Sequence, residues 1–385
     1  MKISAPWLTD PATVAVLSAL GGEVLFVGGC VRNAVLQAPV SDIDLSTPVL
    51  PQEVIARAER AGLQAVPTGI DHGTVTLIAR GQPFEVTTFR ADVETDGRRA
   101  VVRFSTDIAE DARRRDFTMN ALYADAEGRV IDPLDGLADM LARRVRFILT
   151  PEDRIREDAL RILRFFRFNA WYGSDIDPEG LAACAGLAEK VDDLARERIG
   201  AEMRKLLAAP DPAPATASMA AAGVLARCLP GADPAGLAPL VAREEATGAH
   251  IAWLTRLASL GGVEVAARLR LSRQEERGLD ALITARDSPY GPAALAAAYG
   301  GEAATGAMLL RTSLVPADWP TVMAEIERGR GREMPLQAGD LMRIAALSGP
   351  SLGAALTRAK RAWFASDLRL DKAGLMEEAL KGHHN

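Results

Sequence analysis

The sequence predicts a mixed α+β head at the N-terminus, in which helices pack on a mixed sheet, followed by a long all-α remainder. Segments rich in β-branched and aromatic residues are concentrated in the first ~150 residues. From Pro151 onward, alanine and leucine dominate, and glycine and proline separate short amphipathic segments typical of helices. The length of 385 residues corresponds to two or three domains.

Within the head, apolar runs and alternating polar and apolar residues indicate the elements one by one. The predicted order is a strand at 24–27, a helix at 30–37, a strand at 42–46, a helix at 51–61, and strands at 73–79 and 83–89 joined by a hairpin turn at Gly81-Gln82. Residues 90–103 are polar and contain glycine, and they predict a mobile loop. Three prolines (Pro210, Pro212 and Pro214) predict a linker after a helix that ends near Leu207.

Composition excludes several classes of protein. With 48% apolar and 25% charged residues, the chain has the balance of an ordinary globular protein. No apolar run reaches ~18 residues, so no membrane span is expected, and residues 1–10 lack the pattern of a secretory signal. The three cysteines are sparse, which fits a reducing cytoplasm and predicts neither a disulfide framework nor a zinc site. None of the four histidines precedes an aspartate, which excludes histidine-based metal hydrolysis.

The charge distribution is uneven. The net charge of −6 argues against non-specific binding of nucleic acid. Residues 98–116 nevertheless hold six arginines against four acids, and residues 143–167 hold eight against four. Arginine outnumbers lysine throughout the chain, which also fits a bias in genome base composition. The arginines alone therefore do not indicate an RNA partner.

Two aspartates on a predicted strand provide the first candidate site. Asp42 and Asp44 are two residues apart, so on a strand their carboxylates project to the same face. Such a pair suits Mg²⁺, which proteins hold with one or two carboxylates together with substrate phosphates. Upstream, Gly28-Gly29 opens a helix whose free N–H groups suit an anion. The combination indicates metal-assisted nucleotidyl transfer; the alternative is a solvated strand edge after an ordinary turn.

Glu85 lies on a later predicted strand and is a candidate third acid. An equally good interpretation is a glutamate that faces solvent at an alternating strand position. Arg113, Arg114 and Arg115 precede Asp116 at a predicted helix start. This segment suits binding of a triphosphate and a ribose, and the alternative is a solvated basic turn.

Residues 157–168 predict one continuous helix. On a helical wheel, Arg161, Arg164 and Arg167 interleave with bulky apolar residues, whereas a surface helix would separate the two kinds. The helix is therefore expected to be largely enclosed, with its arginines facing phosphates, bases or buried acids. Structural ion pairs with Glu157, with Asp158 or with the head are the alternative.

Asp158 and Arg161 are three residues apart and are expected to be neighbours on one side of this helix. A carboxylate beside a guanidinium complements the amino group and the ring nitrogen of cytosine and of adenine. Uracil and guanine present an oxygen in place of the amino group, and this oxygen would repel the carboxylate. The pair therefore predicts selection of C and A without a nucleic-acid template.

Five spaced motifs together resemble a known family. They occur at Gly28–Asn33, Asp42–Leu45, Arg114–Leu122, Ile131–Gly136 and Glu157–Phe168. Their order is that of bacterial class II tRNA nucleotidyltransferases, the CCA-adding enzymes, and of the related bacterial poly(A) polymerases. Arg196–Ile199, with Glu202, Lys205 and Leu206, is similar to the last motif of the family. The resemblance covers roughly residues 22–207.

The resemblance implies a nucleotidyltransferase head at 1–145, which is catalytic, a helical neck at 146–208, which selects the base, and a helical body and tail at 209–385, which bind tRNA. It implies that Asp42 and Asp44 bind Mg²⁺ and that Asp158 and Arg161 read the incoming base. Together with the motif analysis, it gives the nucleotide-binding set Gly28, Gly29, Arg32, Arg115, Asp116, Asp158, Arg161, Arg164 and Arg167. Asp42, Asp44 and Glu85 form the candidate catalytic set.

The expected activity is template-independent addition of C and A to the tRNA 3′ end, with tRNA, CTP and ATP as partners and neither a membrane nor an obligate protein partner. The alternatives are a poly(A) polymerase of the same family, an enzyme that adds only CC or only A, and a non-catalytic RNA-binding module. A strongly basic C-terminal stretch for long RNA would favour a poly(A) polymerase. Residues 360–385 are not strongly basic, because they hold five basic residues against four acids.

Overall fold

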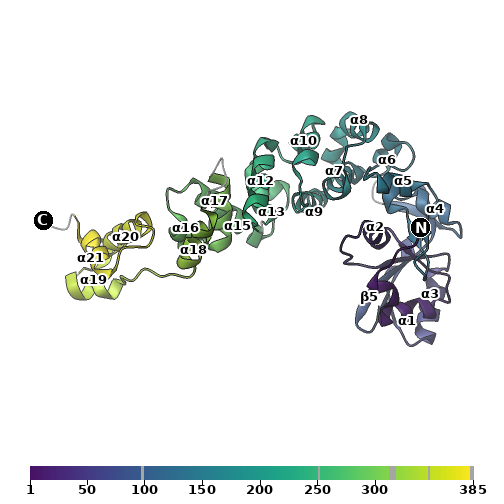
Figure 1. Cartoon of the computed structure of the whole chain (residues 1–385), viewed down its shortest axis with the longest axis horizontal. Coiled ribbons are helices and arrows are strands. Elements are labelled where there is room, and N and C mark those ends of the chain that lie inside the picture. Colours follow the sequence, from purple (N-terminus) through teal and green to yellow (C-terminus); the bar gives the residue numbers. More distant parts are fainter. Residues whose placement is uncertain (97–98, 250–251, 312–317, 346, 382–385) are drawn as a thin grey trace. The chain divides into compact units, whose positions relative to one another are not determined.

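The computed structural model describes residues 1–96, 99–249, 252–311, 318–345 and 347–381. It divides into two compact units, which are described separately (Figure 1). Unit 1 comprises Met1–Pro210 and Ser218–Cys228, and unit 2 comprises Asp211–Ala217 and Leu229–Asn385. Every described strand belongs to unit 1, and helices follow the strand-containing head along the chain. The predicted fold class, an α+β head followed by an all-α remainder, is confirmed.

The head is built on a seven-stranded mixed sheet. Its strands, in spatial order, are β3 (Gln64–Gly69), β4 (Thr74–Ala79), β5 (Gln82–Thr88), β2 (Asp44–Thr47), β1 (Leu25–Val27), β8 (Tyr123–Ala124) and β9 (Val130–Ile131). Only the β2–β5 pair is parallel. Helices α1 (Pro11–Ala19) and α3 (Pro51–Arg60) contact β4, and α2 (Gly29–Val35) follows β1 directly.

The predicted hairpin is confirmed, with its turn one residue earlier than expected. Ala79 pairs with Gln82, so the turn residues are Arg80 and Gly81. Both have positive φ, at 52° and 81°, as a type I′ turn requires. Strand β3 was not predicted from the sequence. None of its residues is fully buried, so the alternation that marks a half-buried strand is absent.

The prediction of a mobile loop at 90–103 is wrong. Strands β6 (Arg90–Asp96) and β7 (Arg99–Phe104) form a separate antiparallel pair, with a register shift between Asp92 and Glu94. Backbone hydrogen bonds hold this pair, and polar side chains do not prevent such pairing. Gly97 and Arg98, which belong to the predicted loop, lie outside the described residues.

The remaining helices of unit 1 follow β7. They are α4 (Ile108–Arg113), α5 (Gly136–Leu141), α6 (Pro151–Glu157), α7 (Leu160–Tyr172), α8 (Pro178–Gly186), α9 (Arg196–Leu207) and α11 (Val224–Cys228). Helix α9 ends at Leu207 as predicted, and the units divide at Pro210. Pro214 does not belong to the predicted linker, because it lies in the first turn of α10 (Ala213–Ala221). The boundary between head and neck at 145/146 stays a prediction.

The single helix predicted for 157–168 is interrupted at Asp158. Helix α6 ends at Glu157 and α7 begins at Leu160, while Asp158 has an extended backbone with φ −150° and ψ 106°. The Asp158 carboxylate accepts a hydrogen bond from the backbone N–H of Leu160 at 3.1 Å. Short acidic side chains commonly offer such a local bond in competition with the helix. Asp158 therefore does not share a helical face with Arg161, contrary to the prediction.

An aromatic cluster encloses α7. Phe165 stacks on Phe147 with ring centroids 5.4 Å apart, and Phe117 contacts Phe147 and Phe168 at 5.0 and 5.2 Å. All four rings are buried, and burial of each contributes roughly 1.5–3 kcal/mol. Five residues of α7 are buried, so the predicted enclosure of this helix is confirmed. The cluster fixes α7 against the loop segments around Phe117 and Phe147.

Unit 2 is built from helices. Helix α10 is divided between the two units after Ala217. The helices that lie wholly in unit 2 are α12 (Leu237–Thr247), α13 (Trp253–Leu260), α14 (Val265–Arg268), α15 (Arg273–Asp287), α16 (Pro292–Tyr299), α17 (Gly301–Arg311), α18 (Trp319–Gly329), α19 (Ala338–Ala345), α20 (Gly349–Ala365) and α21 (Lys372–Leu380). In the last part of the chain, Trp363 and Phe364 of α20 join a core with residues of α16, α19 and α21. Among the described residues, no helix combines the length and the apolar character needed to cross a bilayer.

Candidate active site

A cavity of about 400 Å³ in unit 1 collects nine of the predicted site residues. The lining consists of Gly28, Gly29, Arg32, Asp44, Arg115, Asp116, Asn120, Asp158, Arg161, Arg164 and Phe168. Three predicted residues (Asp42, Glu85 and Arg167) do not line it. Asn120 and Phe168 lie within the family motifs, but the sequence analysis assigned them no site role.

The turn between β1 and α2 forms one wall of the cavity. Gly28 has φ 69° and ψ −118°, a conformation that is strained for any residue with a side chain. A Cβ atom at this position would lie 3.5 Å from Nη1 of Arg115. The positive φ therefore favours glycine at position 28, whereas a Cβ there would make only an ordinary contact with Arg115.

Of the three candidate catalytic acids, Asp44 is the one that lines the cavity. It begins β2, and the parallel register places it opposite Glu85 of β5. Burial, then the charges of Glu85 and Asp42, raise the pKa of Asp44, and Arg115 partly offsets this. Asp42 is exposed and precedes β2, so the prediction that both aspartates lie on one strand is wrong. The charges of Asp42 and Glu85 nevertheless act on Asp44.

Arg115 is held by an acid that the sequence analysis did not identify. Asp111, on α4, is completely buried. It accepts hydrogen bonds from Nε of Arg114 at 2.7 Å, from Nη2 of Arg115 at 3.1 Å and from the Tyr123 hydroxyl at 2.6 Å. Burial alone would raise the pKa of Asp111, but the two arginines and the tyrosine lower it to about 2. The i, i+4 spacing of Asp111 and Arg115 was the available sequence signal.

A chain of hydrogen bonds between residues that line the cavity connects α2 to α7. Nη1 of Arg32 donates to Oδ1 of Asn120 at 2.6 Å, and the Asn120 amide donates to Oδ1 of Asp116 at 2.9 Å. Oδ2 of Asp116 accepts from Nε of Arg164 at 2.6 Å. Burial would raise the pKa of Asp116, but the Arg164 charge and the Asn120 amide lower it below its ordinary value. Both oxygens of Asp116 are engaged, so this carboxylate positions Arg164.

Asp158 and Arg161 both face the cavity, but each is paired with a different residue. Nη2 of Arg198, on α9, donates to both oxygens of Asp158 at 3.1 and 2.9 Å. Arg161 donates to Oε2 of Glu157 at 2.6 Å and to the backbone carbonyls of Arg154 and Arg114. Arg198 was not predicted as a partner, because it lies 40 residues further along the chain.

Arg167 lies outside the cavity. Its Nε is 2.7 Å from Oε2 of the buried Glu202, and its guanidinium stacks over Phe168 at 4.4 Å. Glu202 is not among the partners named in the alternative, which are found instead for Arg161, paired with Glu157, and for Arg164, paired with Asp116 of the head. A direct contact of Arg167 with a nucleotide stays a prediction.

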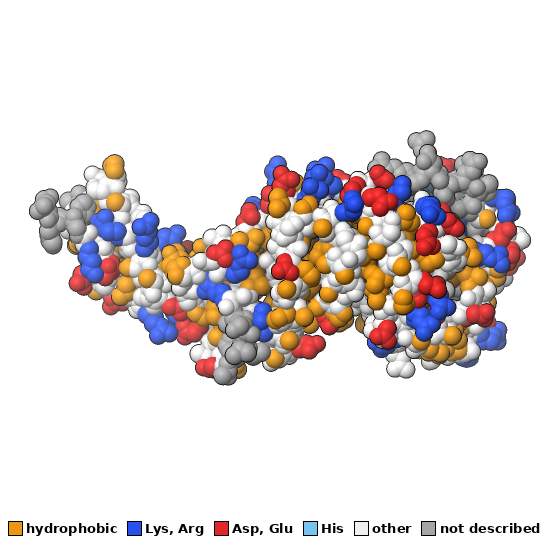
Figure 2. Space-filling view, turned by 90° about the horizontal axis from the view of Figure 1, so that it is seen from above, with side chains coloured by type: hydrophobic (Ala, Val, Ile, Leu, Met, Phe, Trp, Pro, Cys, Tyr) orange, Lys and Arg blue, Asp and Glu red, His pale blue; other side chains and the backbone are white. Residues whose placement is uncertain are grey.

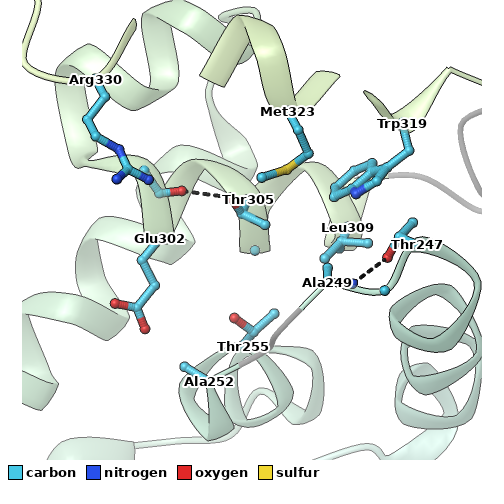
Figure 3. A pocket seen from close by; sticks show the side chains of 13 residues that line it. Thr247, Ala249, Ala252, Thr255, Glu302, Thr305, Leu309, Trp319, Met323 and Arg330 are labelled. Carbon is cyan, nitrogen blue, oxygen red and sulfur yellow. Dashed lines mark hydrogen bonds between the residues drawn. The ribbon is translucent and has the colours of Figure 1, made fainter. Parts of the chain in front are cut away.

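A second cavity, of about 440 Å³, lies in unit 2 (Figure 3). Glu302 and Thr305 from α17, Trp319 and Met323 from α18, and Arg330 line it in part. It contains none of the predicted site residues. On the face seen in Figure 2, basic and acidic side chains occur in small mixed groups with no continuous basic area. The cavity of unit 1 is therefore the better candidate for the chemistry.

Comparison with known proteins finds two family models that match parts of the chain. Residues 24–146 match the Poly A polymerase head domain, and residues 173–235 match the probable RNA and SrmB-binding site of polymerase A. The CCA-adding enzyme of Oceanobacillus iheyensis is 43% identical over 206 residues, which is 53% of this chain and 50% of that protein. The CCA-adding enzyme of Leuconostoc citreum is 42% identical over 193 residues, or 50% and 47% of the two chains.

Over about half of its length, the chain is thus similar in sequence to CCA-adding enzymes and poly(A) polymerases.

Solved structures of the family extend the likeness to the whole chain. The Bacillus stearothermophilus CCA-adding enzyme in complex with CTP superposes with a TM-score of 0.76 at 28% identity, covering 99% of both chains. The Thermotoga maritima CCA-adding enzyme complexed with tRNA shares the fold, with a TM-score of 0.70 at 20% identity, and covers 100% of this chain and 99% of that one. By sequence, the aligned part spans about half the length of the curated relatives.

The family generally depends on a divalent metal, and the acids around Asp44 fit one. Among the described residues, no group of three His, Cys, Asp or Glu side chains forms a preformed cage. Mg²⁺ does not require such a cage, because it is commonly held by one or two carboxylates plus substrate phosphates. Burial is the main cause of the raised pKa of Asp44, and the charges of Glu85 and Asp42 add to it; a bound cation would favour the charged carboxylate against all three.

We expect Asp111→Asn to destabilise the protein by about 2 kcal/mol at neutral pH, because the charges of Arg114 and Arg115 lose their buried partner. The pKa of Asp111 is lower in the folded than in the unfolded state. Its stabilisation is therefore complete above the ordinary value of 3.8 and is lost as the pH falls through about 2. Urea denaturation of both proteins between neutral and acid pH measures this difference.

The matched control for this measurement is Asp71→Asn, which removes an exposed acid of the same unit. It should leave the free energy of unfolding within about 0.5 kcal/mol of the wild type. An Asp111→Asn penalty that stays constant down to pH 2 would show that the loss comes from packing and not from charge.

Proposed function

We propose that this protein adds C and A to the 3′ end of tRNA from CTP and ATP, without a nucleic-acid template, and releases pyrophosphate. The observation that carries the proposal is the convergence of Asp44, four arginines and Asp158 on one cavity of unit 1. The match to CCA-adding enzymes over half the chain, and the likeness to a CTP complex over its whole length, support it. The head would perform catalysis, the neck would select the base, and residues 209–385 would hold the tRNA.

The triphosphate is assigned to Arg32 and Arg115. Both guanidinium groups are anchored: Arg32 by Asn33, Asn120 and Tyr172, and Arg115 by Asp111. An anchored guanidinium binds phosphate oxygens with little loss of side-chain entropy. Gly28 and Gly29 let phosphates approach the backbone, because no side chain covers the turn.

Base selection is assigned to Asp158 and Arg161. A carboxylate oxygen accepts more than one hydrogen bond, so Asp158 can accept from a base amino group while Arg198 holds it. Arg161 has five N–H donors, of which three are assigned to protein acceptors among the described residues. The interruption of the helix at Asp158 frees its side chain from the helical face and points it into the cavity beside Arg161.

Asp42 and Asp44 are assigned to Mg²⁺, which when bound favours the 3′-alkoxide and stabilises the charge of the pyrophosphate leaving group. Glu85, directly opposite Asp44, is proposed as the third acid of this cluster. It is exposed and does not line the cavity, so its role lies in holding the neighbourhood of Asp44 negative. All three cysteines are free and buried, in keeping with the proposal that the protein works in the reducing cytoplasm.

The main alternative is a poly(A) polymerase of the same family, followed by an enzyme that adds only CC or only A. These alternatives are separated by supplying each nucleoside triphosphate in turn to tRNA transcripts that lack the tail, lack only the last A, or are complete. Oligo(A) serves as the control acceptor. A CCA-adding enzyme extends the first two tRNAs and stops; unlimited extension of oligo(A) with ATP would identify a poly(A) polymerase, and no incorporation would favour an RNA-binding module.

Asp44→Ala and Asp42→Ala should each lower incorporation of both C and A by at least about a thousand-fold, because several kcal/mol of metal-dependent stabilisation is lost. Binding of tRNA should stay nearly unchanged, since neither residue is assigned to the RNA. Single-turnover incorporation and filter binding measure the two properties. Near-normal incorporation by either variant would contradict the metal assignment.

Asp158→Ala should lower the ratio of kcat/KM for CTP over UTP by about ten- to a hundred-fold on tRNA that lacks its tail. The variant loses the acceptor for the amino group and the repulsion against O4 of uracil. Arg161→Ala should weaken CTP and ATP together, because it removes the donor to the ring nitrogen of both bases.

Asp158→Asn is the matched variant, because an amide accepts from cytosine through its oxygen and donates to uracil through its nitrogen. It should raise the use of UTP more than it lowers the use of CTP. If Asp158→Ala lowers activity without changing the CTP/UTP ratio, Asp158 acts only as the ion-pair partner of Arg198.

A further inference from the structure

A small pocket of about 270 Å³ lies in unit 1, and its lining shares no residue with the cavity described above. Trp171 and Tyr172 from the end of α7, Pro39 and Pro210 supply flat apolar walls, and Arg143 is also part of the lining. The pocket is smaller than the roughly 300–1,000 Å³ of sites that enclose drug-sized ligands. Its size and flat walls suit a single planar group.

Trp171 is held in place although it is 40% exposed. Its indole Nε1 donates to the backbone carbonyl of Lys205, on α9, at 2.7 Å. Large hydrophobic side chains are usually buried, and an exposed indole that is already oriented is a ready stacking surface. Binding on this ring would cost little conformational entropy.

A row of aromatic rings connects the cavity to the pocket. Phe168 lines the cavity, its ring centroid lies 5.6 Å from that of Tyr172, and Tyr172 lies 6.4 Å from Trp171. Arg32 belongs to the same row, because its guanidinium stacks over Tyr172 at 4.0 Å and donates to the Tyr172 hydroxyl at 2.8 Å. The pocket is thus coupled by direct contacts to a residue assigned to the triphosphate.

Arg143 adds a positive charge to the pocket. It is exposed, and within the described part of the chain it has no ion pair, whereas its neighbours Arg144 and Arg146 lie 3.8 and 3.6 Å from Asp139. A stacking ring beside an uncompensated arginine is the combination with which proteins bind single-stranded nucleic acid, the ring taking the base and the arginine the phosphate.

We propose that this pocket binds one unpaired base of the acceptor RNA strand, stacked on Trp171, with a phosphate of the same strand at Arg143. The inference rests on the proposed function, since it assumes that an RNA 3′ end approaches the cavity. Trp171 is a positioning residue in this scheme: it holds the strand while the reaction takes place beyond Arg32.

The first test is Trp171→Ala, assayed with tRNA that lacks its tail. Loss of one stacked base should raise the KM for tRNA by about 5- to 100-fold and leave the KM for CTP unchanged. Trp171→Phe, which keeps a ring, should restore most of the affinity. The matched control is Leu149→Ala, which removes another exposed apolar side chain of unit 1 and should change neither constant. A Trp171→Ala protein that behaves like this control would overturn the proposal.

A second test locates the base without measuring turnover. Abasic sites are placed one at a time at the 3′-terminal nucleotides, and the Kd of each RNA is measured for the wild type and for Trp171→Ala. If Trp171 stacks on one base, a single abasic position weakens binding to the wild type but not to the variant, because both changes remove the same contact. Additive effects at every position would contradict the stacking. Fluorescence of Trp171, isolated by subtracting the Trp171→Phe signal, should be quenched by RNA with the base and not by the matching abasic RNA.

Arg143→Gln keeps a side chain of similar shape and tests the phosphate contact. The slope of log Kd against log salt concentration should fall by about 1, since one phosphate contact is lost. An unchanged slope would remove Arg143 from the proposal.

The failure of the proposed function can be distinguished from the failure of this inference. If RNA binding depends on Trp171 but no C or A is incorporated, the proposed function is contradicted and the RNA-binding role of the pocket is supported. If C and A are incorporated and Trp171→Ala changes nothing, only the RNA-binding role of the pocket is contradicted, and the proposed function is supported.

Discussion

Buried guanidinium groups are the constraint on which this site depends, because an arginine cannot give up its charge and must find acceptors wherever it is enclosed. The hydrogen-bond chain from Arg32 through Asn120 and Asp116 to Arg164 meets this demand at both ends of the cavity. It also joins α2, which follows strand β1 of the sheet, to α7, which contributes Phe165 and Phe168 to the aromatic cluster. The contacts that satisfy the arginines are therefore also contacts that hold the sheet-containing part of unit 1 against α7.

The parts of this arrangement that local pattern determines could be predicted from the sequence. The β1 strand, the Gly28-Gly29 turn and the enclosed face of α7 each follow from the spacing of apolar residues and glycines within a few positions. Strand β3 was missed because its exposed surface carries no alternation, and the pair of β6 and β7 was mistaken for a loop because polar composition does not exclude backbone pairing. Strands that are held by backbone hydrogen bonds, and not by burial of an apolar face, produce no clear alternation of polar and apolar residues. The sequence pattern therefore contains little information about them.

Within the site, sequence alone identified most of the lining residues but not the way they are paired. Asp158 was expected beside Arg161 on one helix, whereas its side chain caps the backbone at Leu160 and accepts from Arg198. Pairing of this kind depends on how α9 packs against α7, a tertiary contact between segments about 40 residues apart. Asp111 was missed for a related reason: its importance comes from complete burial beneath Arg114 and Arg115, which no local charge pattern distinguishes from a solvated helix face.

The balance of charge in the cavity explains why anchored arginines and clustered acids occur side by side. Four arginines line it against three aspartates, and Asp116 is already neutralised by Arg164. In the proposed complex, the arginines attract a triphosphate, because the lining as a whole is net positive. Phosphates bound beside Asp44, whose pKa is already raised by burial and by Glu85, would still be repelled by that carboxylate. Under the proposed function, a divalent cation that arrives with the nucleotide would remove this local repulsion, and the acids around Asp44 would be the groups that hold it.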